Sequence, residues 1–236
     1  NVMFSQRGVL DIFHTDGQRD EAVRRGNAMI MNGVDAVMLD RAGVMKMVPV
    51  IDEHNGRYPI LGGLLQPRAG NARHDAVVWG YARAADRLGV DIIQNCEVTG
   101  FLRGPDGAMT GVETSRGQIL APKFGVAVAG HTSQVMQMAG LRLPVESHKL
   151  QAFVSESVKP IIHTVATFGV GHLYISQSDK GGLVFGGMLD GYNSFAQRGN
   201  LPIVEDVAEA MMMFLPSLGR VRLLRHWAGV VDMTMD

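Results

Sequence analysis

One stretch of the chain, residues 74–88, places apolar side chains at the spacing of a helix face. Gly89 follows directly and is typical of the residue just after a helix. The pattern therefore predicts a helix over 74–88, and its apolar face is formed by Val77, Val78, Tyr81, Ala84, Ala85 and Leu88.

Capping residues predict further helices. Thr15 with Gln18 resembles a capping box for a helix over 16–31. Asp40 precedes a short helix. Pro216 closes another helix, which we expect to begin near Glu205.

Strand-like runs of two to nine residues predict strands through most of the remaining chain. They cover residues 5–13, 60–65, 90–93, 96–102, 108–113, 119–120, 124–129, 151–158, 173–177, 183–188 and 223–231. The run 124–129 is apolar throughout, as in a strand buried on both faces. Residues 104–107 are a strong turn signal. Because βαβ units alternate with runs of strands, we expect a mixed α/β (α+β) fold with a large, mostly antiparallel sheet.

Composition narrows the class of protein. The chain has 236 residues, 46% of them apolar and 19% charged, as in an ordinary globular protein. A net charge of −1 does not support binding to nucleic acid or to an anionic membrane. Cys96 is the single cysteine, so no internal disulfide forms, and we expect a cytoplasmic location. The chain starts at Asn1 inside an apolar run and ends at Asp236 after another, so we expect an internal fragment of a longer protein.

Residues 66–75 carry the strongest candidate chemistry. A turn rich in Gly and Pro leads to His74, at the predicted start of a helix. A neutral imidazole is a nucleophile and a hydrogen-bonding group, and Arg68 and Arg73 suit a phosphate or a carboxylate. Read alone, a lone histidine of this kind is more often a solvated or capping residue, and solvated surface cations explain the two arginines equally well. No Cys/His spacing accompanies them, so we expect no metal site.

A second candidate is the step from Val126 to Ser133, where an apolar run enters a helix through Gly130 and His131. Free N–H groups at such a step bind phosphates or flavin edges in α/β proteins. An ordinary capped turn is the alternative interpretation. Nothing in the sequence identifies a catalytic base, although Tyr174, Tyr192 and His172 are candidates for pocket residues.

Taken together, several segments resemble the beta subunit of heterotetrameric sarcosine oxidase, within the D-amino-acid-oxidase-like flavoprotein superfamily. The resemblance runs along the whole chain and is carried by residues 4–10, 66–70 with 73–75, 89–101, 129–131, 197–199 and 227–236.

The resemblance implies flavin-dependent oxidation of sarcosine, a small amine, to glycine, formaldehyde or methylene-tetrahydrofolate, and hydrogen peroxide. It implies non-covalent FAD together with FMN bound covalently to His74. It also implies that His131 contacts FMN and that the backbone of Val98 contacts FAD. The implied partners are alpha, gamma and delta subunits, with tetrahydrofolate bound through the alpha subunit.

The resemblance further divides the chain into three parts. Residues 1–65 and 146–236 correspond to the substrate domain, and 66–145 to part of the FAD-binding domain with a small β-meander. We expect the fragment alone to be inactive. Two alternatives remain open: a related dimethylglycine- or proline-type amine dehydrogenase, and a non-catalytic fragment that acts as an interaction surface.

Overall fold

A computed structural model describes residues 3–54 and 57–235 of the chain. These residues form two compact units. The larger, called here the sheet unit, comprises residues 1–80, 150–189 and 198–228. The smaller, called the hairpin unit, comprises residues 81–149, 190–197 and 229–236.

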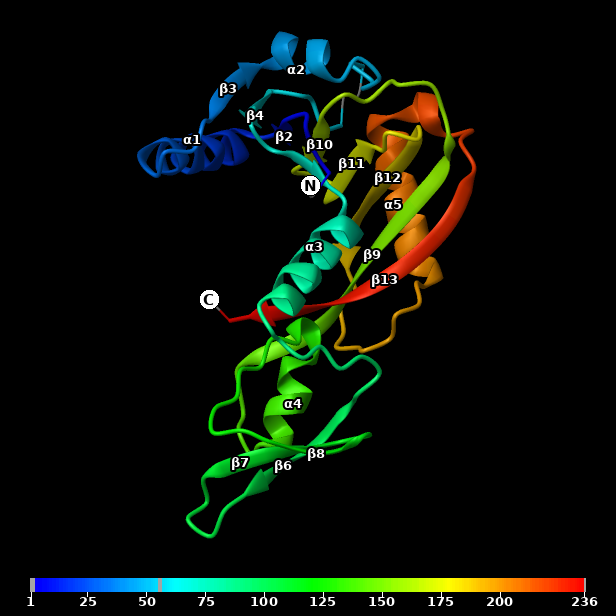
Figure 1. The fold of residues 1–236 in the computed structure, drawn as a ribbon. Helices are drawn as coiled ribbons and strands as arrows, with labels where there is room; N and C mark the ends of the chain where they lie inside the picture. The colour runs from blue at the N-terminus through cyan, green and yellow to red at the C-terminus, as the bar shows by residue number, and fades with distance from the viewer. Residues whose placement is uncertain (1–2, 55–56, 236) are drawn as a thin grey trace. The chain divides into compact units, whose positions relative to one another are not determined.

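An eight-stranded sheet dominates the structure (Figure 1). β10 and β2 pair in parallel, and the other neighbouring pairs from β9 to β3 are antiparallel, which confirms the expected mostly antiparallel sheet. The strands in spatial order are β13 (Leu223–Thr234), β9 (Val145–Ser157), β12 (Gly182–Leu189), β11 (Leu173–Gln177), β10 (Val165–Phe168), β2 (Val9–Phe13), β4 (Gly62–Gln66) and β3 (Val37–Asp40).

Four helices begin in the sheet unit. The side chain of Thr15 accepts the Gln18 N–H, and that of Asp40 accepts the Gly43 N–H, so both predicted caps are confirmed. The helices are α1 (Asp16–Met31), α2 (Arg41–Met47), α3 (His74–Arg87) and α5 (Leu201–Phe214), and a short 3-10 turn, η2 (Pro216–Leu218), follows α5.

Helix α5 supplies much of the core of the sheet unit. It begins four residues before the predicted Glu205, because the Asn200 side chain caps it by accepting the Ile203 N–H at 3.1 Å. Its buried residues recur every three or four positions, which turns one apolar face toward β11 and β12. That face consists of Ile203, Val207, Ala210 and Phe214.

The hairpin unit holds a three-stranded meander and one short helix. Its strands are β6 (Val98–Arg103), β7 (Met109–Thr114) and β8 (Gly117–Leu120), joined as the 104–107 turn signal predicts. η1 (Ala129–His131) leads into α4 (Thr132–Met138). Arg103 in β6 donates to the carbonyl of Ala139, just after α4, at 2.6 Å.

Two predicted strands are wrong. Residues 90–93 and 124–129 form no strand, and most of their apolar side chains are exposed. Both runs have the apolar content of buried strands, but neither forms a ladder with any strand of the described residues. A strand exists only where a neighbour supplies ladder hydrogen bonds, and apolar sequence alone does not guarantee that neighbour.

Candidate functional site

The segment before His74 is fixed by backbone contacts in the sheet unit. β1 (Phe4–Gln6) pairs with β5 (Gly70–Ala72), and the N–H groups of Arg7 and Gly8 both donate to the carbonyl of Ala69. A Cβ on Gly70 would lie 2.0 Å from the Ser5 carbonyl oxygen, so glycine is required there. These contacts hold the turn in place, and α3 begins directly after it with His74 as its first residue.

The side chains around His74 are already paired, whereas its own ring has no hydrogen-bond partner in the part of the chain that the structure describes. Arg73 contacts Asp75 at 2.7 Å, and this hydrogen bond holds the pKa of the Asp75 carboxyl below its usual value. Arg68 pairs with Asp35 at 2.6 Å. Both arginines predicted to hold a phosphate or carboxylate thus contact carboxylates of the chain itself. The exposed His74 imidazole makes no hydrogen bond with the described residues.

A cavity of about 640 Å³ lies in the sheet unit where β10, β11 and β12 come together. Two of the predicted pocket residues, His172 and Tyr174, line it, and burial raises the pKa of the Tyr174 phenol. Apolar residues form most of the remaining wall. The other lining residues are Leu150, Thr167, Phe168, Leu173, Gly187, Met188 and Leu189.

Beside the cavity, two glycines of β12 allow neighbouring groups to approach this strand more closely than a side chain would permit. Tyr174 pairs with Gly186, and a Cβ there would lie 2.9 Å from the phenol oxygen. A Cβ on Gly187 would lie 1.7 Å from the His172 carbonyl oxygen. His172 and Met188 have φ values of 45° and 56°, a strained conformation that is concentrated at functional sites.

Sequence reasoning missed this glycine pair, although the signal was available. Gly186 and Gly187 stand inside an apolar run, and glycine within a strand marks a close approach of another group. Thr167 was also missed, because nothing in its local sequence distinguishes it from other strand residues.

The remaining predicted site residues belong to the hairpin unit. Val98 is the first residue of β6 and pairs with Thr114 of β7. His131 ends η1, and its ring lies 5.5 Å from that of Phe195. Tyr192, the third predicted pocket residue, lies in the same unit and not in the cavity wall. Figure 1 labels β6, which carries Val98.

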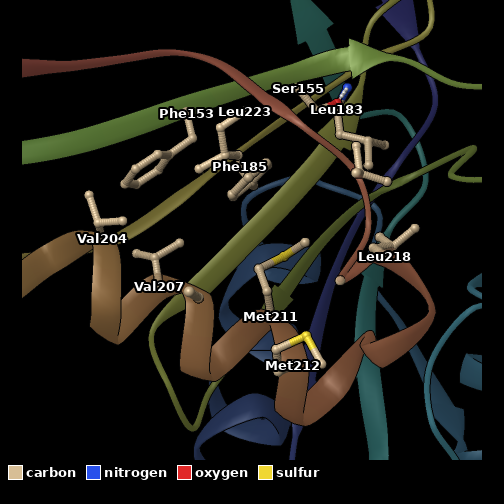
Figure 2. Close-up of a pocket in the computed structure, with 13 residues that line it drawn as sticks. Phe153, Ser155, Leu183, Phe185, Val204, Val207, Met211, Met212, Leu218 and Leu223 are labelled. Atoms are coloured by element: carbon tan, nitrogen blue, oxygen red, sulfur yellow. Dashed lines mark hydrogen bonds between the residues drawn. The ribbon is translucent and has the colours of Figure 1, made fainter.

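A second hollow, of about 200 Å³, lies between α5 and the sheet (Figure 2). Phe153 and Phe185 from the strands and Met211 and Met212 from α5 point into it. Its single polar side chain, Ser155, already donates to the Glu156 carbonyl and accepts the Leu183 N–H. This hollow therefore offers apolar surface and no group for catalysis.

The described residues contain no group of three His, Cys, Asp or Glu side chains placed to hold a metal ion. A helix of the length and apolarity that a membrane span requires is likewise not found among them.

Comparison with known proteins places the chain in a family. Residues 1–236 match the family model described as FAD dependent oxidoreductase (DAO), so the chain belongs to this family. Within it, sarcosine oxidase subunit beta of Rhizobium meliloti (strain 1021) is 65% identical over 236 residues, which is all of this chain and 56% of that protein. The subunit of the same name from Arthrobacter sp is 48% identical over 237 residues and is covered to 58%.

These identities confirm the resemblance found in the sequence. The chain spans a little more than half the length of these curated relatives. Among solved structures, L-proline dehydrogenase from P. horikoshii superposes with a TM-score of 0.91 at 23% identity, covering 100% of this chain and 63% of that one. This likeness supports the fold alone.

Proposed function

We propose that the protein containing this chain oxidises sarcosine as the beta subunit of a multisubunit, flavin-dependent oxidase. The observation that carries the proposal is the 65% identity to a sarcosine oxidase subunit beta over every residue of the chain. The reaction converts sarcosine, oxygen and water to glycine, formaldehyde and hydrogen peroxide. The methyl carbon is oxidised by two electrons and oxygen is reduced by two.

The cavity of the sheet unit suits such a substrate. Its apolar wall disfavours a charged ammonium and so favours the neutral amine, which is the form that is oxidised. The raised pKa of Tyr174 keeps its phenol protonated and able to donate a hydrogen bond to the substrate carboxylate. We assign His172 to the same wall, where its strained backbone fixes its position.

We further propose that His74 carries FMN covalently, that His131 contacts FMN and that the Val98 backbone contacts FAD. The free, exposed imidazole of His74 fits a bond through a ring nitrogen. When bound, the flavins accept the electrons and hydrogen removed from the amine and transfer them to oxygen. Within this scheme residues 66–145 form part of the FAD-binding domain, and the two flanking parts belong to the substrate domain.

The proposed partners are the alpha, gamma and delta subunits, with tetrahydrofolate bound through the alpha subunit. The support is the word "subunit" in the names of the relatives. The chain alone is expected to be inactive.

The test uses the full-length protein co-expressed with its partner subunits. Turnover should be fastest on sarcosine, and faster turnover of dimethylglycine or proline would contradict the proposed substrate. His74→Ala should abolish flavin fluorescence on a denaturing gel, and wild-type peptides spanning an unmodified His74 would contradict the covalent link.

Tyr174→Phe tests the assignment of the cavity. A hydrogen bond to a charged group contributes about 1.5–3 kcal/mol, so kcat/KM for sarcosine should fall about 10- to 100-fold. Tyr81→Phe is the matched control, since the Tyr81 side chain is exposed and lies outside the cavity wall. If the two variants lowered kcat/KM equally, the assignment of the cavity as the substrate site would be refuted.

A further inference from the structure

The loop over residues 190–197 is fastened along the first residues of β9, within the hairpin unit. The Asp190 N–H donates to the Lys149 carbonyl at 3.2 Å, and the Ser194 N–H donates to the Ser147 carbonyl at 2.9 Å. Nδ1 of His148 lies 2.9 Å from the Asp190 carbonyl oxygen. Asp190 and Ser194 of the loop are therefore both held against the strand segment 147–149.

A buried ion pair closes the base of this loop. Nζ of Lys149 lies 2.8 Å from Oδ2 of Asp190, and their side chains are only 5% and 3% exposed. The Tyr192 ring covers the ammonium group, with its centroid 5.5 Å from Nζ. The hydrogen bond to Asp190 raises the pKa of Lys149, which keeps the pair ionised. Removal of either partner would leave the other charge buried without the opposite charge of the pair.

The loop brings an aromatic ring against His131. The Phe195 and His131 ring centroids are 5.5 Å apart and tilted by 36°, within the range of favourable aromatic pairs. The buried hydroxyl of Ser147 donates to the Gly130 carbonyl at 2.6 Å, which fixes the backbone just before His131. Strand and loop together thus restrain both the backbone and the ring of this histidine.

We propose that Lys149 and Asp190 are positioning residues that lock the 190–197 loop, so that Phe195 holds the His131 imidazole in one orientation. In the flavin enzyme this orientation sets the contact between His131 and FMN, a consequence that rests on the proposed function. The positioning itself does not depend on any bound group.

The test measures deuterium exchange at Cε1 of each histidine by mass spectrometry, in the full-length subunit assembled with its partners. This exchange reports the environment of one imidazole at a time. Lys149→Met and Phe195→Leu should each change the His131 half-life about two- to tenfold, the range expected for loss of an aromatic pair. Lys149→Arg, which keeps the charge, should restore most of the wild-type value.

The matched control is Arg24→Met. Arg24 pairs with Glu21 at the same 2.8 Å, but both side chains are exposed in the sheet unit. This variant should leave the His131 half-life unchanged, and the exposed His163 should exchange at the same rate in every variant. His14 is buried and should exchange slowly, and that slow exchange would show in each sample that the fold is intact.

An unchanged His131 half-life in folded Lys149→Met would overturn the proposal. If Lys149→Met does not fold, Phe195→Leu tests the proposal, because this variant leaves the ion pair in place. An unchanged His131 half-life in Phe195→Leu would also overturn the proposal. The bound flavin adds an independent readout. Its absorption bands should shift in Lys149→Met and should lie at the wild-type wavelengths in Lys149→Arg. Absence of flavin from His74, or of sarcosine turnover, would refute the proposed function while leaving the His131 measurement valid.

Discussion

Gln177 is the residue whose loss should most clearly destabilise the sheet unit. Its side chain is buried at the end of β11 and contacts five backbone groups. Oε1 accepts the N–H groups of Ile161 and Ile162 at 2.8 and 3.1 Å. Nε2 lies within 2.9–3.3 Å of three carbonyl oxygens, those of Val158, Lys159 and Gly181. One amide thus contacts four of the seven residues that connect β9 to β10.

Gln177→Leu keeps the approximate volume and removes every one of these polar contacts. A buried N–H left without a partner costs about 1–3 kcal/mol. Ile162 is buried and Ile161 only half-buried, so the full cost applies to one N–H and part of it to the other. The free energy of unfolding should fall by about 2–4 kcal/mol, which corresponds to a Tm lower by about 4–15 °C.

The measurement is a thermal melt of the full-length protein, with hydrogen exchange of the Ile161 and Ile162 amides as the local readout. Both amides should exchange faster in Gln177→Leu. Gln118→Leu, at an exposed position on β8, is the control and should change stability by no more than about 0.5 kcal/mol. A Tm for Gln177→Leu within 1–2 °C of wild type would show that the amide network contributes little, and the reasoning would fail.

Two further predictions concern the same sheet. His14 is buried against Phe168 and Phe214, and burial lowers its pKa, so the unfolded chain takes up a proton near pH 6.5 while the folded chain does not. The free energy of unfolding should therefore fall as the pH drops below about 6.5. Urea titrations at pH 5 to 8 measure this dependence, and it should be weaker in His14→Phe. If the free energy of unfolding depended on pH equally in both proteins, His14 would not be its source. Gly186→Ala should cost about 1–3 kcal/mol and raise the KM for sarcosine, because its Cβ would lie 2.4 Å from a backbone oxygen. Gly125→Ala, with open space around its Cβ, is the control, and equal losses in both would contradict the steric argument.

Local signals in the sequence predicted much of the fold. The 74–88 periodicity with Gly89 located α3 to within one residue, and Thr15 and Asp40 located the starts of α1 and α2. These predictions succeed because caps and periodicity act within one or two turns of helix. The predicted strands at 90–93 and 124–129 failed because pairing depends on a distant neighbour.

The candidate site was only partly predictable, for the same reason. His172 and Tyr174 were singled out as side chains, but the cavity that they share is completed by residues of β9, β10 and β12, which are distant in sequence or paired only by register. The contact of His131 with Phe195, 64 positions away, could not be read from either segment. Long-range register decides such contacts, and short motifs do not encode it.

The parallel pairing of β2 with β10 also has a consequence for how the protein is made. Val9 pairs with Val165, so the middle of the sheet joins segments separated by more than 150 residues. On the ribosome, β2, β3 and β4 emerge long before β10, and one edge of β2 stays open until then. The buried Leu10 and Ile12 are exposed to wrong partners during that interval. Non-local pairing of this kind folds slowly, so we expect the nascent chain to stay prone to aggregation until Phe168 has left the ribosome.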